Sequence, residues 1–168
     1  SVPHSFCLLL NDPMRIRIVT SLDTDFSTVV RHFDQRLLAA VSPPFPPTRL
    51  LRYDGNRPGG EVHVELNFIF FRQVWKSVIV SHEENDERFV FTDEGTQLPF
   101  FLAAWHHEHR VERTATGCRI VDDLRFRSPS PLTDWLLYPL MYGQFWLRKP
   151  LYRRYFRRSP PAPEGGAK

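Results

Sequence analysis

Two histidines and an aspartate at matching positions of two strand-like segments are the residues of this chain best suited to chemistry. His107 and His109 lie in the segment 103–112, and Asp122 lies in the segment 118–127. An imidazole beside a carboxylate can orient a polar group of a ligand, or it can act as a general acid or base. It can also form a buried hydrogen bond that only stabilises the fold. The sequence offers no separate nucleophile beside the pair, so catalysis is the least favoured of these three interpretations.

The spacing of the two histidines also raises the question of a metal site. Because side chains alternate along a strand, His107 and His109 share one face and can reach the same ion. Asp122 and one further residue would have to complete the ligand set. Most paired strand histidines bind nothing, and no C-x-x-C or zinc-type spacing accompanies these two. We therefore predict no metal and no cofactor.

A β-hairpin is expected to hold these residues together. Residues 114–117, Thr-Ala-Thr-Gly, supply a turn between the two alternating segments. The predicted inward face carries Trp105, His107, His109, Val111, Ile120, Asp122, Leu124 and Phe126. The other face is almost entirely charged, with both signs available for cross-strand pairs, and is expected to face water. A polar cluster on an inward face must be hydrogen-bonded or must line a cavity.

Aromatic side chains make up 14% of the chain, and large rings can fill a core or wall an apolar pocket. We expect some of each here, because a sheet that grips one helix cannot fill its interior with aliphatic side chains alone. The predicted ligand-binding set joins aromatic residues to the polar cluster. It comprises Phe68, Phe70, Trp75, Trp105, His107, His109, Asp122, Phe126, Tyr138 and Tyr142.

Before the hairpin, the chain alternates between strand-like segments and turns. The predicted strands are 14–20, 48–54, 61–71, 74–82 and 88–92, and the short turns favour antiparallel pairs. Residues 93–98 are expected to form a polar turn around Gly95. In residues 21–41 the apolar spacing changes to three and four, which predicts a helix. The proline-rich segment 42–47 ends this helix, and its Phe45 is expected to dock as a plug.

A long helix is predicted at the C-terminal end, from about Leu132 to about Phe156. Ser130 and Pro131 are suited to its cap and its first turn. Pro139 and Pro150 are expected to bend or interrupt it. Its predicted apolar stripe consists of Leu132, Leu136, Leu140, Gly143, Leu147 and Leu151, widened by Trp135, Tyr138, Tyr142, Phe145, Trp146 and Tyr152.

Charge is unevenly distributed along the chain. The whole chain carries +3, but residues 148–168 hold seven Lys or Arg and one Glu, so residues 1–147 carry −3. The domain itself is therefore not basic, and no nucleic-acid partner is expected. The segment Arg148–Arg158 interleaves basic and aromatic residues, which suits weak contact with an anionic membrane surface. The alternative is a solvated helix end whose cations suit the helix dipole.

The length of 168 residues and the 42% hydrophobic content fit one domain with a sizeable core. We predict a flexible N-terminus over residues 1–13, the domain over 14–158 and a disordered tail over 159–168. The two cysteines, Cys7 and Cys118, do not indicate a structural disulfide, so a reducing compartment is expected. No segment is long and apolar enough to predict a membrane span, and the expected location is cytoplasmic.

The predicted order is a strand, a helical segment, six further antiparallel strands and a long helix. Over about Met14 to Phe156, this order resembles the helix-grip fold of the START-like (SRPBCC) superfamily, which includes polyketide-cyclase-like proteins. Short motifs extend the resemblance to an uncharacterised ligand-binding-like branch. They are Ser42-Pro43-Pro44, Tyr53-Asp54-Gly55, Trp105-x-His107-x-His109, and Gly117 followed by Asp122 and Pro129. The resemblance implies an α+β fold, with a seven-stranded curved antiparallel sheet wrapped around the C-terminal helix.

The resemblance also implies a hydrophobic cavity between the sheet and that helix. Proteins of the superfamily bind lipids, sterols, polyketides or hormones, and a minority are cyclases or dehydratases. We therefore predict a non-enzymatic domain that binds a hydrophobic small molecule, with His107, His109 and Asp122 as the polar end. The first alternative is a cyclase- or dehydratase-like enzyme that uses these residues as acid and base. The second alternative is a protein-interaction domain with a filled core.

Overall fold

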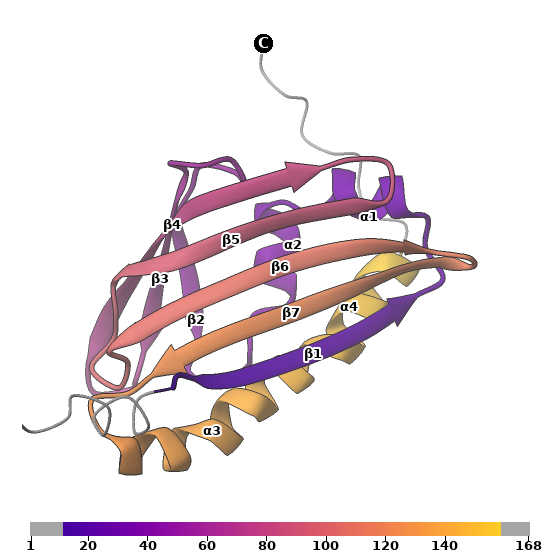
Figure 1. Ribbon diagram of the computed structural model, residues 1–168. Helices are drawn as coiled ribbons and strands as arrows, with labels where there is room; N and C mark the ends of the chain where they lie inside the picture. The colour runs from indigo at the N-terminus through magenta and orange to yellow at the C-terminus, as the bar shows by residue number, and fades with distance from the viewer. Residues whose placement is uncertain (1–11, 159–168) are drawn as a thin grey trace, which may run out of the picture.

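The computed structural model describes residues 12–158. Residues 1–11 of the predicted flexible N-terminus and the predicted tail, 159–168, lie outside the described residues. Seven strands form one sheet in the order β1-β7-β6-β5-β4-β3-β2, and each neighbouring pair is antiparallel (Figure 1). The strands are β1 (Met14–Leu22), β2 (Thr48–Tyr53), β3 (Glu61–Asn67), β4 (Arg72–Glu84), β5 (Arg88–Gln97), β6 (Ala104–Thr114) and β7 (Gly117–Arg127). The helices are α1 (Phe26–Arg31), α2 (Gln35–Ala40), α3 (Pro131–Trp146) and α4 (Arg148–Arg157).

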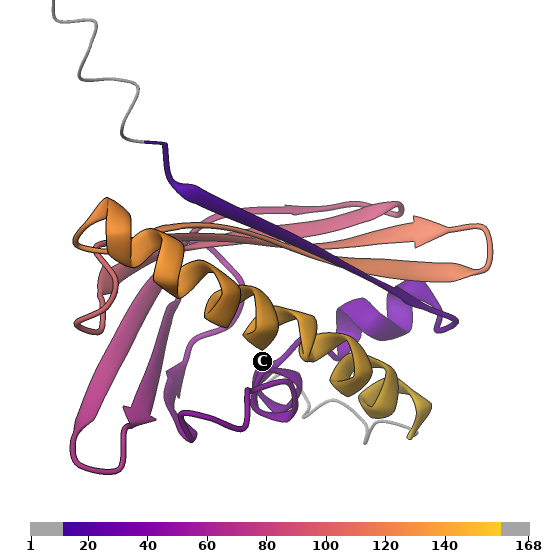
Figure 2. The same ribbon diagram turned by 90° about the horizontal axis from the view of Figure 1, so that it is seen from below.

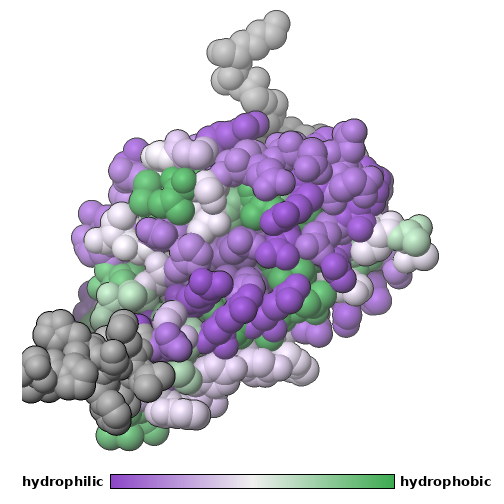
Figure 3. Space-filling model, in the orientation of Figure 1, coloured by the Kyte–Doolittle hydropathy of each residue, from purple (hydrophilic) through white to green (hydrophobic). Residues whose placement is uncertain are grey.

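The sheet curves around the C-terminal helices, which confirms the predicted α+β helix-grip architecture. Figure 2 shows α3 and α4 following one another across the concave side of the sheet, and α2 packs against α4. The face of the sheet turned toward the viewer in Figure 3 is mainly hydrophilic, as expected from its charged side chains. The apolar interior therefore lies between the sheet and the helices.

Two short helices replace the single helix predicted over 21–41. The carboxylate of Asp25 caps α1, and the carboxylate of Asp34 accepts hydrogen bonds from the backbone N–H groups of Arg36 and Leu37 to begin α2. A capping residue has a non-helical backbone, so Asp34 interrupts the helix at the point where it starts the next one. The apolar spacing alone did not reveal this second start.

The predicted C-terminal helix is present as two helices that meet at Leu147. The side chain of Ser130 caps α3, and Pro131 occupies its first turn, as predicted. The junction lies in the turn that precedes Pro150, which has no N–H to donate to the carbonyl four residues earlier. Pro139, which was expected to bend or interrupt the helix, lies within α3.

The leucine stripe predicted for this helix faces the core only toward its end, where Leu151 packs against an apolar cluster; Phe145 and Tyr152, from the predicted flank of the stripe, are buried. Leu132, Leu136 and Leu140 are exposed, whereas Met141 and Phe145 are buried in the core. Apolar side chains surround much of α3, so the leucine spacing could not identify the buried side. A row of apolar side chains along α3 is therefore in contact with solvent.

Two apolar clusters form the core, and the inner face of β6 joins them. Trp105 belongs to the cluster beneath α3, and Val111 belongs to the cluster between α1, α2 and α4. His107 and His109 lie between these two residues on the same face of the strand. The polar residues therefore separate two apolar regions.

A two-point contact between Arg15 and Asp123 fastens the edge strand β1 to β7. Arg15 donates from Nε to Oδ1 at 2.9 Å and from Nη2 to Oδ2 at 2.6 Å. The hydrogen bonds and positive charge of Arg15 lower the pKa of Asp123 below its ordinary value. The contact therefore contributes stability while the carboxyl is ionised, and this contribution is lost as the pH falls through the lowered pKa.

We predict that Arg15→Gln lowers the free energy of unfolding slightly at pH 7, because half of the Arg15 side chain is exposed and solvent screens the pair. The difference from the wild type should shrink as the pH falls below about 4, where carboxyls lose their charge. Urea unfolding at several pH values measures it. Arg153→Gln is the control, because Arg153 is an exposed arginine of α4 that makes no ion pair in the described structure. A difference that grows in acid would contradict the prediction.

Candidate functional site

A cavity of about 470 Å³ lies between the concave side of the sheet and the helices α2, α3 and α4. Its walls are mainly apolar, with side chains from β2, β3 and β4 on one side and from α2 and α3 on the other. Phe45, Phe100 and Leu140 line it and are more than half exposed, so they mark its mouth. The polar end is formed by Asp93, His107, His109 and Arg148.

Strand register places the charged and imidazole groups of this polar end. Asp93 on β5 lies opposite His107 on β6, and His109 lies opposite Asp122 on β7. All four side chains are on the concave face of the sheet, and all four residues are buried. The inward face predicted for the hairpin is thus confirmed by the pairing of its two strands.

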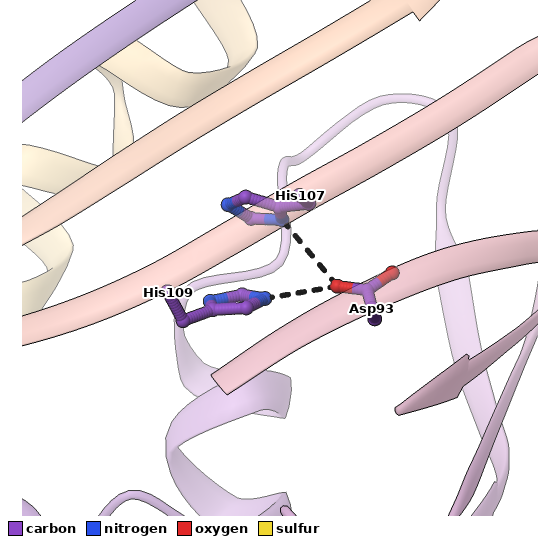
Figure 4. Close-up of side chains that lie close together, drawn as sticks. All are labelled: Asp93, His107 and His109. Carbon is purple, nitrogen blue, oxygen red and sulfur yellow. Dashed lines mark hydrogen bonds and ion pairs between the residues drawn. The ribbon is translucent and has the colours of Figure 1, made fainter. Parts of the chain in front are cut away.

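The two histidines are each held by a different carboxylate. His107 Nε2 lies 3.0 Å from Asp122 Oδ1, and His109 Nε2 lies 3.2 Å from Asp93 Oδ1. Trp105 Nε1 donates to the other oxygen of Asp93 at 3.0 Å. Figure 4 shows both imidazoles directed toward Asp93, with His107 Nδ1 at 3.8 Å from Asp93 Oδ1.

Arg148, the first residue of α4, places its guanidinium at the polar end of the cavity. Its Nη1 lies 3.5 Å from Asp122 Oδ1, and its guanidinium stands over the Phe145 ring at 4.2 Å from the centroid. The Arg148 side chain is only 13% exposed. It therefore neutralises a carboxylate in the interior and ties α4 to the middle of the sheet.

Burial and hydrogen bonding set the protonation of this cluster. Burial lowers the pKa of His107 to about 4, against the hydrogen bond to Asp122, which raises it. Burial alone would raise the pKa of Asp122, but the His107 hydrogen bond and the Arg148 charge lower it to about 2. Burial likewise opposes ionisation of Asp93, yet the hydrogen bond with His109 lowers its pKa. At neutral pH the cluster thus holds two carboxylates and a neutral His107.

This arrangement can do two kinds of chemistry. A neutral imidazole and a carboxylate at the cavity wall can accept or donate hydrogen bonds to a ligand, or can exchange a proton with it. One ligating atom from each of Asp93, His107 and His109 lies within 4.8 Å of the others, which is close enough for one metal ion.

Half of the predicted ligand-binding residues lie against the cavity. They are Phe68, Trp75, Trp105, His107 and His109. The rings of Trp75 and Trp105 meet edge to face, with centroids 4.6 Å apart, and form part of the wall near Asp93. Whether these residues bind a ligand stays a prediction.

The other predicted residues are placed elsewhere, which corrects the proposed lining. β3 ends at Asn67, so Phe70 falls in the following turn and is 93% exposed. Phe126 is fully buried within the core beneath α3, and Asp122 lies behind His107. Tyr138 and Tyr142 stack on each other along α3 outside the cavity. Phe45, expected as a plug, lines the mouth and is 53% exposed.

Two residues of the polar end are not among the predicted site residues. The sequence predicts a polar turn at Asp93, but β5 runs on to Gln97, and the alternation of Phe89, Phe91 and Asp93 continues on the inward face. That alternation was the available signal. Arg148 was read as part of a basic surface, and no local pattern distinguishes it from the exposed arginines that follow.

Within residues 12–158 no helix combines the length and apolarity that crossing a membrane requires. No protein-family model matches the chain, and no curated protein matches its sequence. Solved structures do match its fold.

Three solved structures illustrate the match. The Zhui aromatase/cyclase from Streptomyces sp. R1128 has a TM-score of 0.66 at 11% identity, covering 87% of this chain and 96% of that one. Norcoclaurine synthase from Thalictrum flavum, in complex with dopamine and hydroxybenzaldehyde, has 0.64 at 10% identity, covering 95% of each chain. Ginseng major latex-like protein 151 from Panax ginseng has 0.59 at 11% identity, covering 86% of this chain and 98% of that one. Identities this low establish a common fold alone.

The Arg148–Asp122 pair gives a stability prediction. Arg148→Met leaves the Asp122 carboxylate, which is 1% exposed, without its cation and should lower the free energy of unfolding by about 3 kcal/mol. Chemical denaturation measures the loss. Adding Asp122→Asn to Arg148→Met should recover part of it, because the buried charge is removed. Lys149→Met is the control at the neighbouring position; an equal loss there would contradict the role assigned to Arg148.

Proposed function

Because this chain has the START-like (SRPBCC) helix-grip fold, we propose that it binds a hydrophobic small molecule in the cavity between its sheet and its C-terminal helices. The observation that carries the proposal is the cavity itself. Its volume of about 470 Å³ falls in the range of small-molecule sites, and apolar side chains form most of its wall. Binding without catalysis remains the favoured function.

The shape of the cavity supports a particular kind of ligand. Its mouth is apolar, and its inner end carries Asp93, His107 and His109. A lipid-, sterol- or polyketide-like molecule with one oxygen-bearing end would place that end against the imidazoles and its apolar body against the aromatic wall. One solved structure with this fold holds the aromatic compounds dopamine and hydroxybenzaldehyde, which is consistent with a ligand of this size.

The first alternative, a cyclase- or dehydratase-like enzyme, is supported by one specific contact. His109 and Asp93 form a hydrogen-bonded pair at the cavity wall, where a bound molecule could exchange a proton with it. The Zhui aromatase/cyclase has the same fold as this chain, which is consistent with the enzyme alternative. The acid and base would then be His109 and Asp93, rather than His107 and Asp122, because Asp122 lies behind His107.

The second alternative, a protein-interaction domain with a filled core, is less well supported. A closely packed interior leaves few voids larger than a water molecule, and the cavity is far larger than that. The cytoplasmic location inferred from the cysteines stays a prediction.

The proposal predicts that filling the cavity abolishes ligand binding. Val64 lines the cavity from β3, so Val64→Trp should place an indole in the space that the ligand occupies. The affinity for a fluorescent fatty acid, measured by titration, should fall by at least about tenfold, which is equivalent to 1.4 kcal/mol. Native mass spectrometry of the purified wild type should also show an added mass that extracts as a hydrophobic compound.

Val80→Trp is the matched control, because Val80 is exposed on β4 and does not line the cavity. It should bind the fluorescent fatty acid as the wild type does. Equal binding by Val64→Trp and the wild type would show that the probe does not enter the cavity, and the proposed site would then be wrong.

We also propose that the molecule contacts anionic membranes, with a surface that differs from the predicted Arg148–Arg158 segment. Arg148 forms an ion pair with Asp122 in the interior, so it is not part of the surface proposed to contact the membrane. The helix α4, with its exposed arginines, continues from α3, on which Trp135 is 72% and Leu136 is 68% exposed. Exposed large apolar side chains and arginines along consecutive helices suit the boundary between lipid headgroups and acyl chains.

The membrane proposal predicts that Trp135→Glu/Leu136→Glu reduces sedimentation with phosphatidylserine-containing vesicles severalfold. The added carboxylates should oppose both insertion and the negative surface potential. Val19→Glu is the control, because Val19 is an exposed apolar residue of β1 and belongs to neither α3 nor α4. Vesicle binding that is unaffected by the double substitution would overturn the assignment of this surface.

A further inference from the structure

We propose that Asp93, His107 and His109 form a binding site for a divalent transition-metal ion, Zn²⁺ or Fe²⁺, with its open coordination positions facing the cavity. This inference goes beyond the proposed binding of a hydrophobic molecule and does not depend on it. It also departs from the expectation of no metal, which rested on the observation that most paired strand histidines bind nothing and which named Asp122, not Asp93, as the further ligand. Asp93 supplies that ligand from the strand beside the histidines.

The three donors have the composition and spacing that such an ion requires. Two imidazole nitrogens and one carboxylate oxygen are donors for Zn²⁺ and Fe²⁺, whereas Mg²⁺ and Ca²⁺ prefer oxygen alone. Asp93 Oδ1 lies 3.2 Å from His109 Nε2 and 3.8 Å from His107 Nδ1. Ligand bonds of about 2.0–2.2 Å place neighbouring donors roughly 3–3.5 Å apart, so small side-chain rotations would complete the site.

A second layer of contacts orients each donor, as is usual around metal ligands. His107 Nε2 is hydrogen-bonded to Asp122 Oδ1 at 3.0 Å, which leaves Nδ1 as the ligating nitrogen. The outer oxygen of Asp93 accepts the Trp105 N–H at 3.0 Å, which leaves Oδ1 for the ion. The His109 ring is stacked on Phe91 with centroids 4.4 Å apart, and this contact fixes its plane.

One ring nitrogen beside the cavity is free to bind an ion. His107 Nδ1 makes no hydrogen bond to the described residues, and its nearest carboxylate oxygen is Asp93 Oδ1 at 3.8 Å. The buried histidine nitrogen without a hydrogen-bond partner is His109 Nδ1, which lies 3.7 Å from Asp122 Oδ1 and leaves Nε2 on the Asp93 side. Figure 4 shows His107 Nδ1 and His109 Nε2 both directed toward Asp93 Oδ1. One ion between His107 Nδ1, His109 Nε2 and Asp93 Oδ1 would give all three atoms a common partner.

The charges around the site favour a cation. Arg148 pairs with Asp122, whereas the ion pairs that Asp93 makes in the described structure are with the two histidines alone. The Asp93 carboxylate, which is buried, thus has no permanently charged partner, and burying an uncompensated charge is costly. A divalent ion would supply the missing positive charge.

The coordination positions of the ion that face the cavity would be open to exchangeable ligands. Asp93, His107 and His109 all line the cavity, so the remaining coordination positions open toward the space proposed for the hydrophobic molecule. An ion there would bind an oxygen of that molecule, from a hydroxyl, carbonyl or carboxylate group. The ligand class is thereby narrowed to hydrophobic compounds that carry such an oxygen.

Titration of the full chain with Zn²⁺, after treatment with a chelator, tests the site by isothermal calorimetry. One ion per chain is expected, with Co²⁺ giving visible absorption bands of nitrogen and oxygen coordination. Asp93→Asn and His109→Gln should each weaken Zn²⁺ binding by more than the roughly 10–100-fold that outer-layer substitutions cost. His106→Gln is the matched control, because His106 directly precedes His107 on β6 but pairs with Glu94 outside the cavity.

Circular dichroism establishes that each variant is folded, and Asp93→Asn keeps the shape of the side chain so that folding is retained. No binding of Zn²⁺, Co²⁺ or anaerobically added Fe²⁺ by the wild type would overturn the proposal. Equal weakening by His106→Gln and Asp93→Asn would overturn it as well. Val64→Trp should lose the fluorescent fatty acid but keep Zn²⁺, so failure of the metal site and failure of the proposed function are separable.

Discussion

Two carboxylates buried inside an apolar shell are the constraint on which the centre of this molecule depends. Asp93 and Asp122 are both buried, and neither can be ionised there without partners. The Arg148 guanidinium gives Asp122 a charged partner, and the indole N–H of Trp105 and the two imidazoles give the carboxylates hydrogen bonds. Their positions bind three strands of the sheet to the beginning of α4, so the polar centre also sets how the C-terminal helices cross the sheet.

The same polar centre explains why the interior is divided. Apolar side chains pack closely on either side of the two histidines, but they cannot cover carboxylates and imidazoles without leaving hydrogen-bonding groups unsatisfied. The cavity lies where these groups face the aromatic wall. A space with one polar end and an apolar body follows from this division, and it is the property that a binding site for an amphiphilic molecule needs.

Much of the fold was predictable from the sequence, because alternation and proline positions act locally. The hairpin faces and the Ser130 cap followed from such signals. The errors arose where a residue's role depends on distant contacts. Asp93 resembles a turn residue until its strand is seen beside β6, and Arg148 resembles a surface cation until α4 is seen over Asp122. The exposed side of α3 was hidden because apolar residues surround much of that helix.

The junction at Leu147 separates two tasks that one straight helix would have to share. α4 begins with Arg148 and is bound to the charged centre, whereas α3 forms a wall of the cavity and part of its mouth. Substitutions in α3 can therefore change the size of the enclosed space while the electrostatic centre stays intact. Such a division lets descendants of this chain acquire new ligands by altering one helix, so the junction is a source of evolutionary adaptability.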